Sequence, residues 1–186
     1  MRNTSKMTTL ENKFPLLAVE HGCIISKDAD ITVAFEVELP ELYTVTGAEY
    51  EAIHGCWCKA IKVLPYFCVV HKQDWFIKEK YMPELQKDDM SFLSRSFERH
   101  FNERPYLKHS CYLYLTKTTK ERNRMQSNFS TLCRGHIIPK ELDKETAGKF
   151  MEAAEQFERI MNDSGFVMLR RLSTDEIVGT EKSAGL

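Results

Sequence analysis

The stretch 31–39 constrains the fold more than any other part of this sequence. Apolar side chains at Ile31, Val33, Phe35, Val37 and Leu39 alternate with Thr32, Ala34, Glu36 and Glu38. Successive side chains of a strand point to opposite faces, so this period of two predicts a β-strand with one face in a core and the other largely in water. Pro40 ends the strand, and Cys23–Ser26 is expected to pair with it as an N-terminal hairpin.

Two long helices are expected from capping and spacing. Thr46 and Glu49 have the spacing of a capping box, in which a hydroxyl caps the helix and a carboxylate lies three residues on. The helix predicted over 47–64 has apolar residues at helical spacing, namely Tyr50, Ile53, Trp57, Ile61 and Leu64. A second helix is predicted over 143–163, with Phe150, Ala154, Phe157 and Met161 on one face. Gly165 stops it.

The remaining patterns complete an α+β order. Strands are expected over 66–77, 106–116 and 166–172, and a short helix over 92–101. The predicted fold is a mixed or antiparallel sheet in βαββαβ (ferredoxin-like) order, with an N-terminal hairpin and one inserted helix. Both long helices should cover its apolar face. The residues expected to be buried together are Val33, Phe35, Val37, Trp57, Ile61, Phe150, Ala154 and Phe157.

The length of 186 residues fits one domain. Residues 1–13 are expected to be a flexible lead-in, and 14–172 to form a single α+β domain. Ser173 and Glu176 form another capping box, which predicts that 173–186 is the start of a helix or a linker.

Charge and hydropathy exclude several function classes. The formal net charge of −1 gives the chain as a whole no electrostatic footprint for nucleic acid or an anionic membrane. No apolar run approaches the roughly 20 residues that a membrane-spanning helix needs, and the first residues are polar. We therefore expect a cytoplasmic chain without a transmembrane segment, in which any membrane contact is peripheral. The six cysteines lack the spacing of a disulfide framework and are expected to be reduced.

Motifs for catalysis are missing from the sequence. Nothing matches GxxxxGK[ST], the loop that holds nucleotide phosphates, so no nucleotide site, catalytic residue or cofactor is expected in this chain. His54 and Cys58 share a helix face, but two ligands do not make a structural zinc site, which needs four. A packed helix face is therefore expected there.

One basic cluster is the candidate for partner contact. Lys117, Lys120, Arg122 and Arg124 stand within eight residues of the polar segment 117–134, which is predicted to be a mobile loop. Such a loop attracts DNA phosphates or carboxylates on another protein, and the alternative is a solvated surface loop. Tyr112 and Tyr114, on the strand before it, resemble base-stacking aromatics of RNA-binding sheets, but the glycine-rich basic consensus of those strands is missing. Core or partner-facing tyrosines are expected instead.

Several segments carry a family resemblance. They are Lys13-Phe14-Pro15-Leu16-Leu17, Cys23-Ile24-Ile25-Ser26-Lys27, Phe92–Phe101, Arg104-Pro105-Tyr106-Leu107 and Tyr112–Arg124. Together they resemble the N-terminal region of the TraG-type ATPases of conjugative transposons, over nearly the whole chain. The resemblance implies an N-terminal α+β domain that ties a RecA-like motor to inner-membrane subunits of a type IV secretion channel for DNA transfer. ATP and Mg²⁺ would belong to that motor, whose motifs this sequence does not reach.

Three functions follow as hypotheses. The first is a non-enzymatic assembly or docking domain of a conjugation ATPase, peripheral at the inner membrane, with self-association possible through the full-length motor. The second is a small nucleic-acid-binding module that uses 117–124, where four cations would give only weak, salt-sensitive binding. The third is a small enzyme with an unrecognised site, which a deep pocket lined with polar groups would favour.

Overall fold

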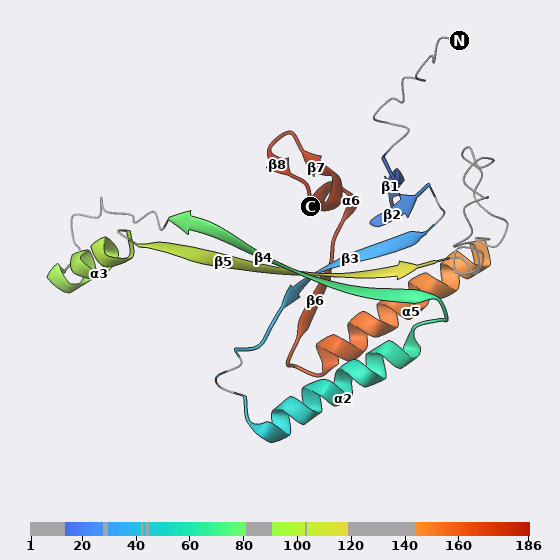
Figure 1. Cartoon of the computed structure of the whole chain (residues 1–186), viewed down its shortest axis with the longest axis horizontal. Coiled ribbons are helices and arrows are strands. Elements are labelled where there is room, and N and C mark those ends of the chain that lie inside the picture. Colours follow the sequence, from blue (N-terminus) through green and yellow to red (C-terminus); the bar gives the residue numbers. More distant parts are fainter. Residues whose placement is uncertain are drawn as a thin grey trace, which may run out of the picture. The chain divides into compact units, whose positions relative to one another are not determined.

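The computed structural model describes residues 14–27, 30–41, 43, 45–80, 91–102, 104–118 and 144–186. The predicted lead-in 1–13 and nearly all of the predicted loop 117–134 lie outside these ranges. The chain forms two compact units: unit 1 comprises 1–72 and 112–186, and unit 2 comprises 73–111. The predicted α+β class is confirmed, with a mostly antiparallel sheet and four described helices (Figure 1). The prediction of a single domain over 14–172 stays a prediction.

The N-terminal strands pair in sequence. Strand β1 (Leu16–Glu20), β2 (Cys23–Ser26) and β3 (Ile31–Glu38) are antiparallel neighbours, which confirms the predicted hairpin. His21 and Gly22, between β1 and β2, have φ values of 52° and 68°. Positive φ at both central residues is the geometry of the type I′ turn, whose twist matches that of the flanking strands.

Strand β3 is the centre of the sheet. The path of neighbouring strands is β1-β2-β3-β5-β4, with β4 at Cys68–Lys80 and β5 at Pro105–Lys117. Strand β6 (Met168–Arg171) also pairs with β3, in antiparallel register. The first residues of β3 face β2, and the later ones, Phe35 to Glu38, face β6. The short strands β2 and β6 therefore pair with successive parts of β3.

Two long helices pack beside each other in unit 1. Helix α2 (Gly47–Val63) runs along α5 (Lys144–Asp163), and α5 packs on β6 (Figure 1). The capping box of α2 is confirmed: the Glu49 N–H donates to Thr46 Oγ1 at 3.3 Å, and the Thr46 N–H donates to Glu49 Oε2 at 2.7 Å. Local sequence therefore sets where α2 begins, independently of its tertiary contacts.

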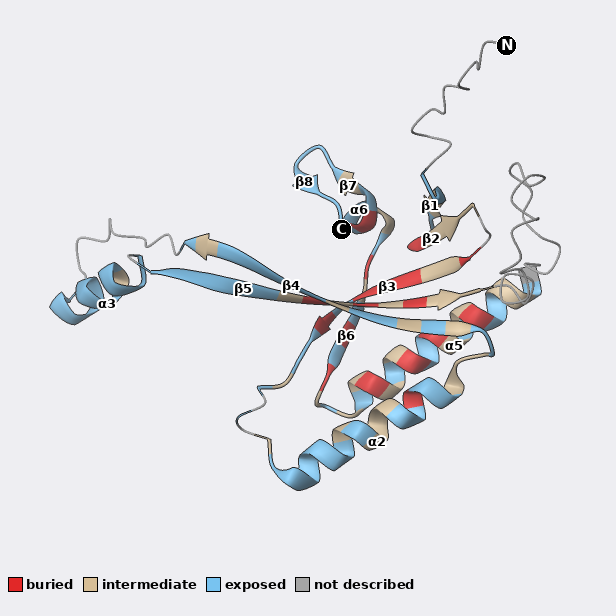
Figure 2. Cartoon of the chain, in the orientation of Figure 1, coloured by how far each residue is buried: buried red, intermediate tan, exposed pale blue. Residues whose placement is uncertain are grey.

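The core joins β3, β5 and β6 to α5 (Figure 2). The largest fully buried side chains are Phe35, Phe150, Phe157, Leu113, Leu115, Met161, Val33 and Val167. Six of the eight residues predicted to be buried together are buried. Trp57 is only half-buried, with its ring in edge contact with Phe157 at 6.1 Å between centroids.

The prediction for Ile61 is wrong, because its side chain is 48% exposed. Helix α2 turns Cys56, Trp57 and Ala60 towards α5: Ala60 is fully buried, and the Cys56 thiol donates to the Ile160 carbonyl at 3.3 Å. Each residue advances a helix by about 100°, so Ile61 points away from the contact that Ala60 makes.

A smaller apolar cluster in unit 1 includes the C-terminal segment. Helix α6 (Thr174–Val178) starts at the predicted capping box and is followed by a two-stranded hairpin, β7 (Gly179–Thr180) and β8 (Ser183–Ala184). Ile177 of α6 packs with Ala34 and Leu172. The C-terminal segment thereby closes on β3 and on the chain that follows β6.

Unit 2 contains the outer parts of β4 and β5 and helix α3 (Phe92–Asn102). Its strands are joined by polar and ring contacts between exposed side chains. His109 Nε2 lies 2.9 Å from Asp74 Oδ1, and its ring stacks on Phe76 at 4.7 Å. Tyr106 donates to Glu79 at 3.1 Å. None of the helices in the described ranges combines the length and apolar character that crossing a bilayer requires.

Candidate functional site

Of the four predicted contact residues, the structure describes Lys117. It ends β5, and its ammonium group donates to the carbonyls of Tyr66 and Thr118 and lies 5.4 Å from the centre of the Phe67 ring. Thr118 adds two hydrogen bonds to the Phe67 carbonyl, from its N–H at 2.9 Å and its hydroxyl at 3.1 Å. Lys120, Arg122 and Arg124 lie outside the described residues.

These contacts stabilise a strained turn. Phe67 has a φ of 63°, in the left-handed region that bulky residues rarely adopt. This turn also corrects the predicted strand 66–77, because β4 begins only at Cys68. Lys117 and Thr118, the first residues of the basic segment 117–124, therefore bind the turn that precedes β4. The Lys117 ammonium group therefore stabilises this turn in addition to carrying a positive charge.

The same charge acts on a neighbouring thiol. Burial raises the pKa of Cys68, and the positive charge of Lys117 opposes that rise. Because burial is the larger effect, the thiol stays protonated at neutral pH and is a poor nucleophile.

His54 and Cys58 do not form the packed face that was expected. Both side chains are exposed, and Cys58 Sγ lies 3.8 Å from His54 Nε2. Across the described residues, no group of three or more His, Cys, Asp and Glu side chains is placed to hold a metal ion. His54 and Cys58 are one helical turn apart, and their side chains meet on the exposed surface of α2.

Tyr112 and Tyr114 are half-buried on β5. Both pack against the cluster of Ala34, Leu172 and Ile177, and burial raises the pKa of Tyr114. The Tyr114 ring also meets the His71 ring at 5.7 Å. Stacking on bases needs free ring faces, so this packing disfavours the resemblance to an RNA-binding sheet.

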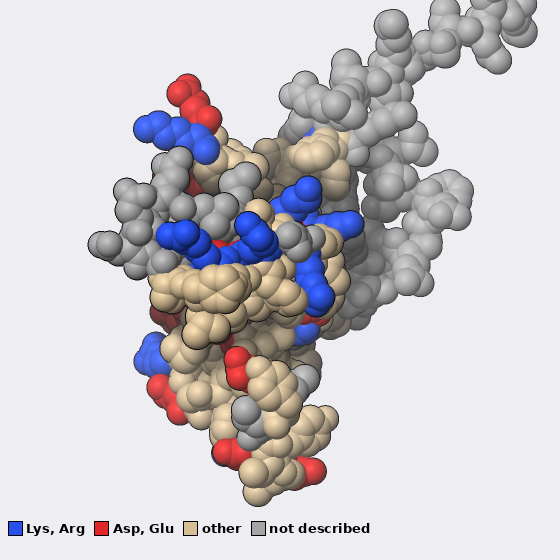
Figure 3. Space-filling model, turned by 90° about the vertical axis from the view of Figure 1, so that its left-hand side faces the viewer, with Lys and Arg blue, Asp and Glu red and all other residues tan. Residues whose placement is uncertain are grey.

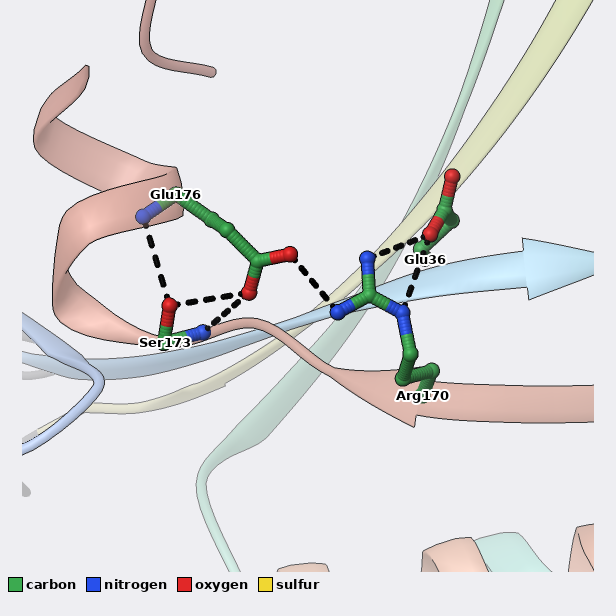
Figure 4. A network of polar contacts seen from close by, with 4 residues as sticks. All are labelled: Glu36, Arg170, Ser173 and Glu176. Carbon is green, nitrogen blue, oxygen red and sulfur yellow. Dashed lines mark hydrogen bonds and ion pairs between the residues drawn. The ribbon is translucent and has the colours of Figure 1, made fainter. Parts of the chain in front are cut away.

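An ionic network that the sequence analysis missed joins β3, β6 and α6 (Figure 4). Arg170 donates to Glu36 Oε2 at 2.6 and 3.1 Å and to Glu176 Oε1 at 2.7 Å. Ser173 donates to Glu176 Oε2 from its N–H and from its hydroxyl, both at 2.9 Å. The Ser173–Glu176 capping box was visible in the sequence, but no local pattern connects Arg170 with Glu36.

The network shifts the pKa values of two of its groups. Hydrogen bonds from the Ser173 backbone, and then from Arg170, lower the pKa of Glu176 to about 2. Glu36 and then Glu176 raise the pKa of Arg170. Glu176 is therefore ionised at neutral pH, and its ion pair with Arg170 can orient α6.

Comparison with known proteins gives one family match. Residues 3–55 match the family model described as "Domain of unknown function, B. Theta Gene description (DUF3875)". Within the described residues, that range includes β1, β2, β3 and the first half of α2. No curated protein matches the chain.

Proposed function

We propose that this chain is the N-terminal assembly domain of a TraG-type conjugation ATPase, which docks the motor onto a type IV secretion channel for DNA transfer. The observation that carries the proposal is the resemblance of Phe92–Phe101 and Tyr112–Arg124 to that family. In this view the chain itself is not an enzyme, and ATP and Mg²⁺ belong to the motor. Its partners are inner-membrane subunits of the channel, and it works in the cytoplasm at the inner membrane.

The architecture supports a ferredoxin-like unit within this domain. The elements β3, α2, β4, β5, α5 and β6 follow one another in the βαββαβ order, with α3 inserted between β4 and β5. Within the sheet, β3 lies between β6 and β5, and β4 lies beyond β5. We propose that these elements form a ferredoxin-like unit to which β1 and β2 are added as the N-terminal hairpin.

The basic segment is the proposed point of contact. Interaction sites are commonly loops held by a rigid scaffold, and Lys117 and Thr118 provide the hold at its beginning. The cations that follow would attract carboxylates of a channel subunit at long range and orient the encounter. A nucleic-acid module is the competing function, and the half-buried positions of Tyr112 and Tyr114 weigh against it.

The test is charge reversal in the full-length motor. The variant should carry Lys120→Glu, Arg122→Glu and Arg124→Glu and leave Lys117 in place, because Lys117 stabilises the turn at Phe67. We expect impaired recruitment to the channel with unchanged ATPase activity. A matched control reverses three exposed cations elsewhere in unit 1: Lys59, Arg159 and Lys182. Normal recruitment and normal DNA transfer in the test variant would reject the proposed contact.

A salt titration separates the two functions. If the segment binds DNA, binding releases cations that had condensed on the DNA phosphates. The affinity for DNA must therefore fall steeply as the salt concentration rises. We expect the isolated chain to bind duplex and single-stranded DNA weakly or not at all at physiological salt. Tight binding with a steep salt slope, abolished by the triple reversal, would favour the nucleic-acid module.

A further inference from the structure

Helix α3 exposes its apolar side chains. Phe92, Leu93, Phe97 and Phe101 are 84%, 78%, 64% and 44% exposed, and no residue of the helix is buried. Leu93, Phe97 and Phe101 are four residues apart and share one side, where the Phe97 and Phe101 rings meet at 4.5 Å. A helix with this pattern normally covers a core, so the exposed side calls for another apolar surface.

The opposite side of α3 is cationic and polar. Arg95 and Arg99 are exposed there, together with Asn102, while Glu98 is half-buried. Leu93, Phe97 and Phe101 therefore lie on one side of this short helix, and the arginines lie on the other side together with Phe92, the first residue of α3. That combination is typical of helices that lie in a membrane–water interface rather than cross it.

The strands of unit 2 also expose apolar side chains, at Trp75, Phe76, Ile77, Tyr106 and Leu107. In the described part of the unit, the exposed Lys and Arg residues are Lys78, Lys80, Arg95, Arg99, Arg104 and Lys108. Its described acids are Asp74, Glu79 and Glu98, and Asp74 and Glu79 bind His109 and Lys108. Figure 3 shows Lys and Arg side chains gathered on one face beside uncharged side chains.

We propose that α3 is an interfacial helix that inserts its Phe and Leu side chains into a bilayer surface containing anionic phospholipid. The inference deepens the proposed function, since it names the means of peripheral attachment to the inner membrane. The whole segment 73–111 contains seven Lys and Arg and seven Asp and Glu. Electrostatic attraction is therefore modest, the apolar side chains supply most of the affinity, and binding is reversible.

A second copy of the chain is the weaker fit to the same surface. At these exposures Leu93, Phe97 and Phe101 offer roughly 400 Å² per copy, because a large apolar side chain buries about 150–250 Å². A symmetric pair of α3 helices would bury about 800 Å², below the roughly 1,000 Å² expected of a specific interface. A bilayer has no such minimum, because each inserted side chain adds its own transfer free energy.

The experiment is vesicle flotation with the full chain. The vesicles contain phosphatidylcholine alone or phosphatidylcholine mixed with phosphatidylglycerol. We expect binding to the mixed vesicles and weaker binding to the neutral ones. The double variant Leu93→Glu and Phe97→Glu should lose at least about tenfold in partitioning, and Arg95→Glu with Arg99→Glu severalfold. Because α3 buries no residue, neither variant should change the unfolding midpoint.

The control variant is Tyr50→Glu, which changes an aromatic residue that is 62% exposed on α2 in unit 1. It should bind vesicles as the wild type does. Failure of the wild type to float with either vesicle overturns the proposal, as does equal binding by the Leu93→Glu, Phe97→Glu variant. Self-association in sedimentation velocity that this variant abolishes, without vesicle binding, assigns the surface to a second copy instead. Vesicle binding requires no channel, so this outcome is independent of the recruitment test of the basic segment.

Discussion

At the scale of single residues, the side-chain amide of Asn162 pairs with the backbone of β6 in the way that a neighbouring strand would. Asn162, near the end of α5, donates from Nδ2 to the Leu169 carbonyl at 3.0 Å and accepts from the Leu169 N–H at 2.6 Å. Leu169 is buried, so both backbone groups would otherwise lack water as a partner. The contact ties the end of α5 to the strand that follows it.

We predict that Asn162→Ala lowers the free energy of unfolding by roughly 1–3 kcal/mol, the cost of leaving buried polar groups unsatisfied. Urea unfolding followed by circular dichroism measures the change. Asn102→Ala, on exposed α3, is the control and should shift the stability by less than about 0.5 kcal/mol. Equal effects of the two substitutions would contradict the role of Asn162.

The network at Glu176 has a predictable pH signature. The pKa of its carboxyl falls from 4.5 to about 2 in the folded chain, so the ionised form stabilises the fold above pH 4.5 and that contribution is lost as the pH falls towards 2. We predict that Glu176→Gln lowers the unfolding midpoint near neutral pH and that the difference from the wild type shrinks between pH 4.5 and 2. Glu181→Gln, in the same terminal segment, is the control. A difference that stays constant over this range would show that the ionised state is irrelevant.

At the scale of elements, α2 shows how a helix face is chosen. Its sequence has apolar residues at several helical positions, and the contact with α5 selects the face with Cys56, Trp57 and Ala60. Ile61 is left in solvent. The spacing was sufficient to predict a helix, but several faces were compatible with it.

This choice of face gives a paired prediction. Ala60→Leu should cost about 1–3 kcal/mol of unfolding free energy, because a larger side chain does not fit where Ala60 meets its neighbours with no exposed surface. Ile61→Ser should cost less than about 0.5 kcal/mol. The unfolding midpoints of the two variants in urea measure these losses. A larger loss for Ile61→Ser than for Ala60→Leu would instead support burial of the face with Ile61, which the sequence pattern predicted.

At the scale of the whole molecule, three features hold a segment in place or leave a surface exposed. Lys117 holds the start of a basic segment, the Arg170 network orients α6, and α3 displays an apolar side. Each of these features fixes a surface or a segment in place.

We predict that the isolated chain neither binds nor hydrolyses ATP. No GxxxxGK[ST] loop is present to place backbone amides and a lysine on the β- and γ-phosphates. Calorimetry with ATP and Mg²⁺, and phosphate release by repurified protein, are the measurements. Turnover that persists through repurification and scales with the protein concentration would contradict the prediction.

The sequence by itself determined the local features of this protein. The alternation at 31–39, the capping boxes at Thr46 and Ser173, and the long apolar stripe of α5 predicted elements that the structure contains. Each depends on residues a few positions apart, whose interactions follow from the geometry of one strand or one helix. The contact role of Lys117, Lys120, Arg122 and Arg124 stays a prediction, and the pairing of Arg170 with Glu36 had no local signal in the sequence.

Only the tertiary structure decided which faces meet. The exposure of Ile61 follows from the packing of α2 on α5, in which Cys56 meets Ile160. The turn at Phe67 is held by Lys117 and Thr118, which are also distant along the chain. Asn162 binds a residue only seven positions on, Leu169, but no sequence pattern indicated this contact between α5 and β6. The sequence predicted a short helix over 92–101, and apolar residues at helical spacing usually occupy a core position. The structure leaves these residues exposed, because exposure depends on the packing of the fold and not on the periodicity of the helix.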